Sequence, residues 1–177
     1  MTVLPSAGGP LPWPQWAYVP DGTGEGDVDR ETLAVVKALV PPAFRGYVPA
    51  RHPALRYGLA LNDLGYFWEA REVLEAVWAA APQGGRERIL LRACIHVANA
   101  NLRLRMQKPH SAARLFGDAL HQLRTLSART GPAVGDGFAD GFPVQALSVQ
   151  LEAKFDHPEL TMADWIALGV VGRPDGR

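Results

Sequence analysis

The amino-acid sequence predicts an all-α fold, a compact bundle of about six or seven helices. Apolar residues recur at spacings of three and four through most of residues 27–155, which is typical of amphipathic helices. Short stretches with Gly or Pro separate these segments, and we find no segment with the two-residue alternation of a half-buried strand. With 177 residues, 47% of them hydrophobic, the chain has the size and composition of a single globular domain with a substantial core.

Three regions are expected within this domain, residues 1–177. Residues 1–26 form an extended arm, residues 27–130 the helical core, and residues 131–177 a Gly-rich loop with the C-terminal helices. The arm interleaves prolines with three large aromatic residues, Trp13, Trp16 and Tyr18. We expect these rings to pack on the protein's own surface, because exposed aromatic rings favour aggregation; a partner's surface is the alternative.

Capping residues, prolines and glycines delimit five helices in the core, at about residues 29–40, 53–65, 66–82, 86–107 and 111–129. The third and fourth are expected to form a central antiparallel hairpin, because their connection is short. A Gly-rich loop over residues 131–143 precedes a sixth helix over residues 144–155. Thr161 and Asp164 have the spacing of a capping box and Gly169 is a stop signal, which together predict a short last helix.

The hairpin at residues 60–82 resembles a tetratricopeptide (TPR) unit. The segments "EAREVLEAVW" and "SAARLFGDAL" also align with each other at an offset of 42 residues. A TPR-like hairpin is therefore expected, although shared helix packing explains the likeness as well as common ancestry does.

Charge is balanced overall but unevenly distributed. Lys plus Arg equals Asp plus Glu, at 18 each, yet residues 83–130 carry nine basic and two acidic residues. We favour neutralisation of this basic stretch by the acidic flanks, and an anionic ligand or nucleic acid is the alternative.

The remaining composition indicates a cytoplasmic protein. Cys94 is the only cysteine, which excludes an intramolecular disulfide and a cysteine-rich zinc module, and its apolar surroundings predict a buried side chain. The N-terminal stretch lacks the basic residues of a signal peptide. No apolar run reaches membrane-spanning length, so no membrane association is expected.

Arg71 occupies an unusual position in the third predicted helix. An apolar stripe of about 100° comprises Phe67, Ala70, Leu74, Val77, Trp78 and Ala81. Arg71 lies on its shoulder, one turn before Glu75, whereas Glu69 and Glu72 lie further round, toward solvent. A buried guanidinium needs a carboxylate or carbonyls, so we expect Arg71 to pair with Glu75 and to stack on a neighbouring tryptophan.

The fourth predicted helix carries a matching polar stripe formed by Arg88, Arg92, His96, Asn99 and Arg103, opposite an apolar side of Leu90, Leu91, Cys94, Val97, Ala98 and Leu102. We favour a solvated face with ion pairs between the two helices. The functional alternative is a small polar pocket, whose candidate residues are Arg71, Glu72, Glu75, His96, Arg92, Glu69 and Trp78.

The stretches "NDLGYFWEAREVLEAVW" and "LLRACIHVANANLRLRMQKPHSAARLFGDAL" resemble the bacterial and archaeal domain-of-unknown-function family numbered 309. The resemblance covers about residues 55–126, and the positions that match the family pattern are Asn62, Gly65, Phe67, Glu69, Ala70, Glu72, Glu75, Trp78, Ile95 and Ala98. It implies a compact all-helical domain and supplies no biochemical role.

Two positions depart from the family pattern. Arg71 stands where the family has a histidine, and His96 stands where it has a glutamine. Because a guanidinium cannot ligate a metal and would repel one, we expect neither a metal nor a cofactor.

Three classes of function remain open. We favour a non-catalytic helical domain that binds another protein or self-associates, because the sequence shows no catalytic triad, phosphate loop or zinc spacing. The alternative is a small-molecule or anion binder, or a hydrolase-like enzyme, that uses Arg71, Glu72, Glu75 and His96. Nucleic-acid binding through residues 83–130 ranks last, because no recognition motif accompanies the charge.

Overall fold

The computed structural model describes residues 11–129, 131, 135–155, 157 and 159–169. Its helices are α1 (Arg30–Lys37), α2 (Pro53–Asp63), α3 (Phe67–Ala80), α4 (Arg86–Arg105), α5 (Pro109–Ala128), α6 (Phe138–Gly141) and α7 (Val144–Lys154), followed by the 3-10 helix η1 (Met162–Asp164). The described part of the chain contains no strand, only an isolated bridge between Pro49 and Gly137. The all-α fold predicted from the sequence is therefore confirmed.

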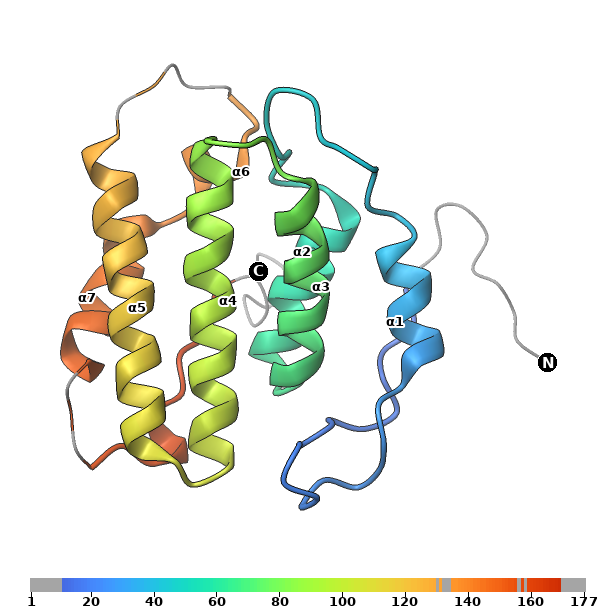
Figure 1. Ribbon diagram of the computed structural model, residues 1–177, viewed down its shortest axis with the longest axis vertical. Helices are drawn as coiled ribbons and strands as arrows, with labels where there is room; N and C mark the ends of the chain where they lie inside the picture. Colours follow the sequence, from blue (N-terminus) through green and yellow to red (C-terminus); the bar gives the residue numbers. More distant parts are fainter. Residues whose placement is uncertain (1–10, 130, 132–134, 156, 158, 170–177) are drawn as a thin grey trace, which may run out of the picture.

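Helices α3, α4 and α5 stand side by side as an up-and-down layer, with α4 in the middle (Figure 1). Helix α2 packs against α3, α1 lies along the outer side of α3, and α7 packs against α5. The antiparallel hairpin predicted from the third and fourth helices is thus at the centre of the bundle. None of the helices within the described ranges combines the length and apolarity needed to cross a bilayer.

Local sequence signals account for the boundaries of α1 and α2. Asp29 caps α1 by accepting a hydrogen bond from the Thr32 amide at 3.2 Å. Pro53 occupies the first turn of α2, where its missing N–H costs nothing, and Gly65 ends the α2–α3 turn with a φ of +91°. The predicted apolar side of α4 is fully or almost fully buried, including Cys94.

Two predictions for the C-terminal region are wrong. Helix α6 lies inside the expected loop 131–143 and forms because Phe138 is buried and its amide donates to the Val48 carbonyl at 2.9 Å. The last segment is helical only over Met162–Asp164, where the predicted Thr161–Asp164 capping box is present. From Trp165 the chain is no longer helical, because its backbone groups bond to side chains of α2 and α4 instead of to one another.

The N-terminal arm packs on the protein's own surface where the structure describes it. Trp13 stacks on Tyr57 of α2, with ring centroids 4.8 Å apart, and the Tyr57 hydroxyl donates to the Pro12 carbonyl at 2.5 Å. Tyr18 meets Trp68 of α3 edge-on, and Val19 is buried. The arm therefore covers the corner formed by α2 and α3.

Candidate functional site

The carboxylate that meets Arg71 is Glu72 and not Glu75. The Arg71 Nη2 lies 3.3 Å from a Glu72 carboxylate oxygen, and the other oxygen accepts from Lys37 of α1 at 2.9 Å. The Arg71 guanidinium also lies 5.5 Å from the centre of the Trp68 ring. Glu75 forms no hydrogen bond or ion pair within the described ranges. The predicted pairing of Arg71 with Glu75 is therefore wrong. Lys37 of α1 pairs with Glu72 and holds its carboxylate beside Arg71.

Stacking on Trp78 replaces the ion pairs that we expected between α3 and α4. The guanidinium carbons of Arg88 and Arg92 lie 4.0 and 4.2 Å from the centre of the Trp78 ring. Arg88 also donates to the carbonyls of Trp78 at 3.2 Å and Ala81 at 3.0 Å, and so satisfies backbone acceptors at the end of α3. No ion pair links α3 to α4 in the described part of the chain.

The charged groups near His96 differ from those near Arg71 and Glu72. Burial lowers the pKa of the half-buried His96 imidazole, the carboxylate of Asp118 on α5 raises it, and Arg92 lowers it again. Within the described residues, no hydrogen bond or ion pair joins His96 to Arg71, Glu72 or Glu75. Arg71 and Glu72 thus pair toward α1, Arg92 meets Trp78 between α3 and α4, and His96 interacts with Asp118 of α5.

Glu69 is fully buried, although the helical wheel placed it toward solvent. Its Oε2 accepts a hydrogen bond from the Tyr18 amide at 3.0 Å, whereas Oε1 is buried without a hydrogen-bond partner. Burial raises the pKa of this carboxyl, and the charge of Arg105 on α4 opposes the shift. The prediction failed because a wheel treats one helix alone, and here the N-terminal arm covers the outer face.

A second buried polar cluster holds the C-terminal segment against α2 and α4. The Asn101 side chain accepts from the Ile166 amide at 2.9 Å and donates to the Ile166 carbonyl at 2.8 Å. It also donates to Oδ1 of Asn62 at 2.8 Å, and Asn62 in turn donates to the Ile166 carbonyl at 3.1 Å. Both asparagines are completely buried.

Asp63 extends this cluster by two residues along the bound segment. One carboxylate oxygen accepts from the Leu168 amide at 2.6 Å, and the other accepts from the Gly169 amide at 2.9 Å. We call Asn62, Asp63 and Asn101 the backbone clamp, because they hydrogen-bond to main-chain groups of Ile166, Leu168 and Gly169. The segment buries Ile166 and Leu168, while Trp165 between η1 and Ile166 stays partly exposed.

The backbone clamp was not recognised from the sequence. A signal did exist, because Asn101 falls on the apolar side of α4, four residues after Val97 and seven after Cys94. A buried amide there requires a hydrogen-bond partner, but nothing local identifies one. The partner is Ile166, 65 residues further along the chain.

The clamp residues of α2 and α4 lie in one continuous stretch with the α2–α3 turn and the glutamates of α3. Residues 55–115 match DUF309, a domain of unknown function. The resemblance seen in the sequence is confirmed over these residues. The DUF309 stretch contributes all three clamp residues, whereas the segment that they hold lies beyond it. No curated protein matches the chain, and no solved structure does so either.

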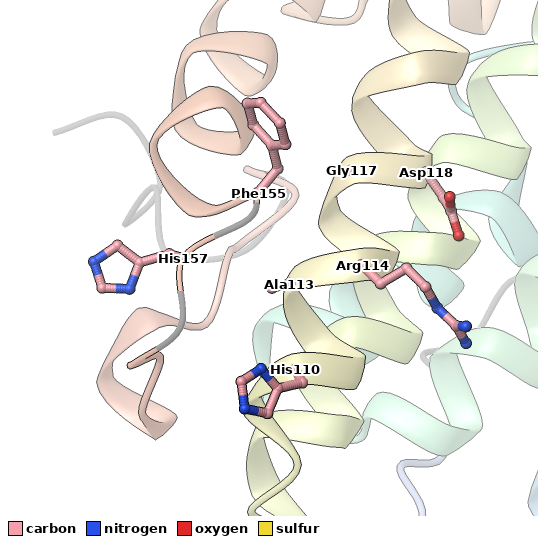
Figure 2. A pocket seen from close by; sticks show the side chains of 7 residues that line it. All are labelled: His110, Ala113, Arg114, Gly117, Asp118, Phe155 and His157. Carbon is pink, nitrogen blue, oxygen red and sulfur yellow. The ribbon is translucent and has the colours of Figure 1, made fainter.

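A cavity of about 590 Å³ opens beside α5, at the end of the DUF309 stretch, and is lined by His110, Ala113, Arg114, Gly117, Asp118, Phe155 and His157. Its polar side chains do not converge. Figure 2 shows Arg114 and Asp118 on one side of α5, with Phe155 and His157 on the other. A catalytic site requires titratable groups within hydrogen-bond reach of a common point, and this cavity lacks that arrangement.

The described residues also contain no group of side chains that could hold a metal ion. Within the described residues, no three His, Cys, Asp or Glu side chains are placed to hold one ion. The Cys94 thiol is buried, and burial raises its pKa, so it has the character of a packed apolar residue and not of a nucleophile.

Proposed function

We propose that this protein is a non-catalytic helical interaction domain that binds an extended polypeptide segment through its backbone. The observation that supports this proposal most strongly is the reciprocal pair of hydrogen bonds between the Asn101 side chain and the main chain of Ile166. An amide side chain used in this way imitates the bonding of a neighbouring β-strand, and main-chain pairing is a general way to bind extended peptides.

The hydrogen bonds of the clamp impose little sequence specificity on the segment that it binds. Its hydrogen bonds reach main-chain groups of Ile166, Leu168 and Gly169, which other residues also possess. Selectivity comes from the two buried side chains of the segment, Ile166 and Leu168, which are two residues apart. The expected ligand is therefore an extended segment with apolar residues at alternate positions.

The clamp is occupied by the protein's own residues 165–169, so a partner segment has to displace them. A cavity of about 360 Å³ lies at the Leu168–Gly169 end of the segment, and both residues belong to its lining. The lining also includes apolar residues such as Leu59, Phe138 and Phe142. It offers a competing segment additional apolar surface. We therefore propose that the occupant is an extended segment of another protein, and the equivalent segment of a second copy would make the same contacts in self-association.

The finer predictions for the domain accompany this proposal. A TPR-like arrangement of its hairpins and a cytoplasmic location are consistent with an interaction domain and remain predictions. Nucleic-acid binding ranks last, because Arg86 and Arg124 of the basic stretch form ion pairs with the flanking Asp140 and Glu152.

Competition with the bound segment tests the proposal. We would label the peptide LTMADWIALG, residues 160–169, with a fluorophore and measure its anisotropy with the full-length chain. The double variant Ile166→Ala, Leu168→Ala weakens the internal occupant and should bind the peptide at least roughly tenfold more tightly than the parent, because less competition has to be overcome.

Two controls accompany this measurement. A peptide with serine at the positions of Ile166 and Leu168 should not bind, and Asn101→Leu introduced into the double variant should abolish binding while circular dichroism still shows a helical fold. Absence of peptide binding to the folded double variant would refute the proposal, as would binding that survives the loss of Asn101.

A further inference from the structure

The junction of α3 and α4 brings two positive charges against one aromatic ring. Arg88 and Arg92 both approach Trp78, at 4.0 and 4.2 Å from the ring centre. The face of an indole attracts a guanidinium, which accounts for each contact separately. It does not remove the repulsion between two cations that share one ring.

Among the described residues, neither Arg88 nor Arg92 forms an ion pair with a carboxylate. Arg88 uses a guanidinium nitrogen for carbonyls at the end of α3, and Arg92 has no hydrogen-bond or ion-pair partner among the residues that the structure describes. Glu72 pairs with Lys37 and Arg71, and Asp140 pairs with Arg86. Part of the basic charge that the sequence concentrates in residues 83–130 thus lies here without an ion pair among the described residues.

A cavity of about 200 Å³ adjoins the two arginines. Its lining comprises Trp78, Gly84, Gly85, Arg88, Ile89, Arg92 and Gln122. Gly84 has a φ of +70°, which favours glycine, and a Cβ built there would meet no other atom within 4 Å. A Cβ at Gly85 would lie 3.7 Å from a Glu87 carboxylate oxygen. Gln122 belongs to α5 and adds an amide that can donate hydrogen bonds.

We propose that Trp78, Arg88 and Arg92 form a binding site for the phosphate group of a small phosphate monoester. Guanidinium groups bind phosphate oxygens through paired, charge-assisted hydrogen bonds, and a dianion compensates two positive charges. The volume of about 200 Å³ suits a single phosphoryl group with a short substituent. This site is separate from the backbone clamp, and either proposal can fail without the other.

Isothermal titration calorimetry with inorganic phosphate at constant ionic strength tests the site. The parent should bind one phosphate per chain with saturation, and Arg92→Gln should weaken binding roughly tenfold or more, because it removes a charge-assisted contact. Arg103→Gln is the matched control. It changes the same charge on the same stripe of α4, about 16 Å away along the helix, and should leave the affinity unchanged.

Two further ligands identify the class of phosphate. Methyl phosphate should bind as inorganic phosphate does, whereas dimethyl phosphate, a monoanion like the nucleic-acid backbone, should bind roughly tenfold more weakly or worse. Absence of saturable binding, or equal affinity in the parent and in folded Arg92→Gln, would overturn the site. Equal affinity for dimethyl phosphate would overturn its assignment to phosphate monoesters.

Discussion

Asn101 satisfies both main-chain polar groups of Ile166, accepting from its amide at 2.9 Å and donating to its carbonyl at 2.8 Å. Both residues are almost completely buried, so water cannot take over either bond. The relationship joins α4 to a segment 65 residues away. It explains why the chain leaves η1 in an extended conformation although its sequence favours a further helical turn.

Replacement of Asn101 should therefore destabilise the fold strongly. Asn101→Leu leaves the Ile166 amide and the Asn62 carbonyl oxygen buried without this partner, and each such loss costs about 1 to 3 kcal/mol. We expect a decrease of about 3 kcal/mol in the free energy of unfolding, measured by urea denaturation. Asn99→Leu, two residues earlier and half-exposed, should change it by no more than about 0.5 kcal/mol. Equal effects of the two substitutions would contradict the role of the clamp.

Removal of residues 1–20 should lower stability and expose apolar surface. The deletion uncovers Tyr57 and Trp68, on which Trp13 and Tyr18 pack, and it removes the buried Val19. We expect a loss of about 2 to 4 kcal/mol together with increased binding of an apolar dye. Trp13→Phe in the full chain should keep most of the stability. An unchanged melting temperature and unchanged dye binding after the deletion would show that the arm does not stabilise the bundle.

The buried Glu69 predicts a specific dependence of stability on pH. Burial raises the pKa of its carboxyl in the folded state, so the folded protein holds this proton more tightly than the unfolded chain does. The contribution of Glu69 to stability is then greatest below its unfolded pKa and decreases as the pH rises through the folded pKa. Each unit of elevation corresponds to about 1.4 kcal/mol.

The variant Glu69→Gln removes this titration. Its free energy of unfolding relative to the parent should become more favourable as the pH rises from about 4 to 7, as measured by urea denaturation at several pH values. Parallel curves for the two proteins over this range would show that the carboxyl has the same pKa in the folded and unfolded states.

Arg71 should contribute less to stability than its position on the helix suggests. Its side chain is 26% exposed and pairs with the similarly exposed Glu72. We therefore expect Arg71→Ala to cost about 1 kcal/mol, and not the roughly 3 to 5 kcal/mol of a fully buried pair. Glu75→Ala should cost no more than about 0.5 kcal/mol. A double-mutant cycle should show coupling between Arg71 and Glu72 and none between Arg71 and Glu75; the reverse would disprove the pairing seen in the structure.

The sequence by itself determined the five core helices and the side of α4 that faces the core. Pro53 and Gly65 mark the ends of α2, and the spacing of Leu90, Leu91 and Cys94 identifies the buried side of α4. These predictions succeed because backbone sterics, capping and the helical period act within a few neighbouring residues. The DUF309 resemblance was found in the same way, from short local spacings such as those around Glu69 and Trp78.

Only the tertiary structure decided which polar groups meet. Glu69 is buried because Tyr18, 51 residues earlier, covers it. Glu72, which is held by Lys37 of α1, pairs with Arg71 in the place expected for Glu75. The clamp on Ile166 and the two arginines on Trp78 likewise depend on how whole helices are placed. A buried polar side chain requires a partner, but its own neighbourhood in the sequence does not name one, because the partner is supplied by whichever distant segment the packing of the core brings alongside.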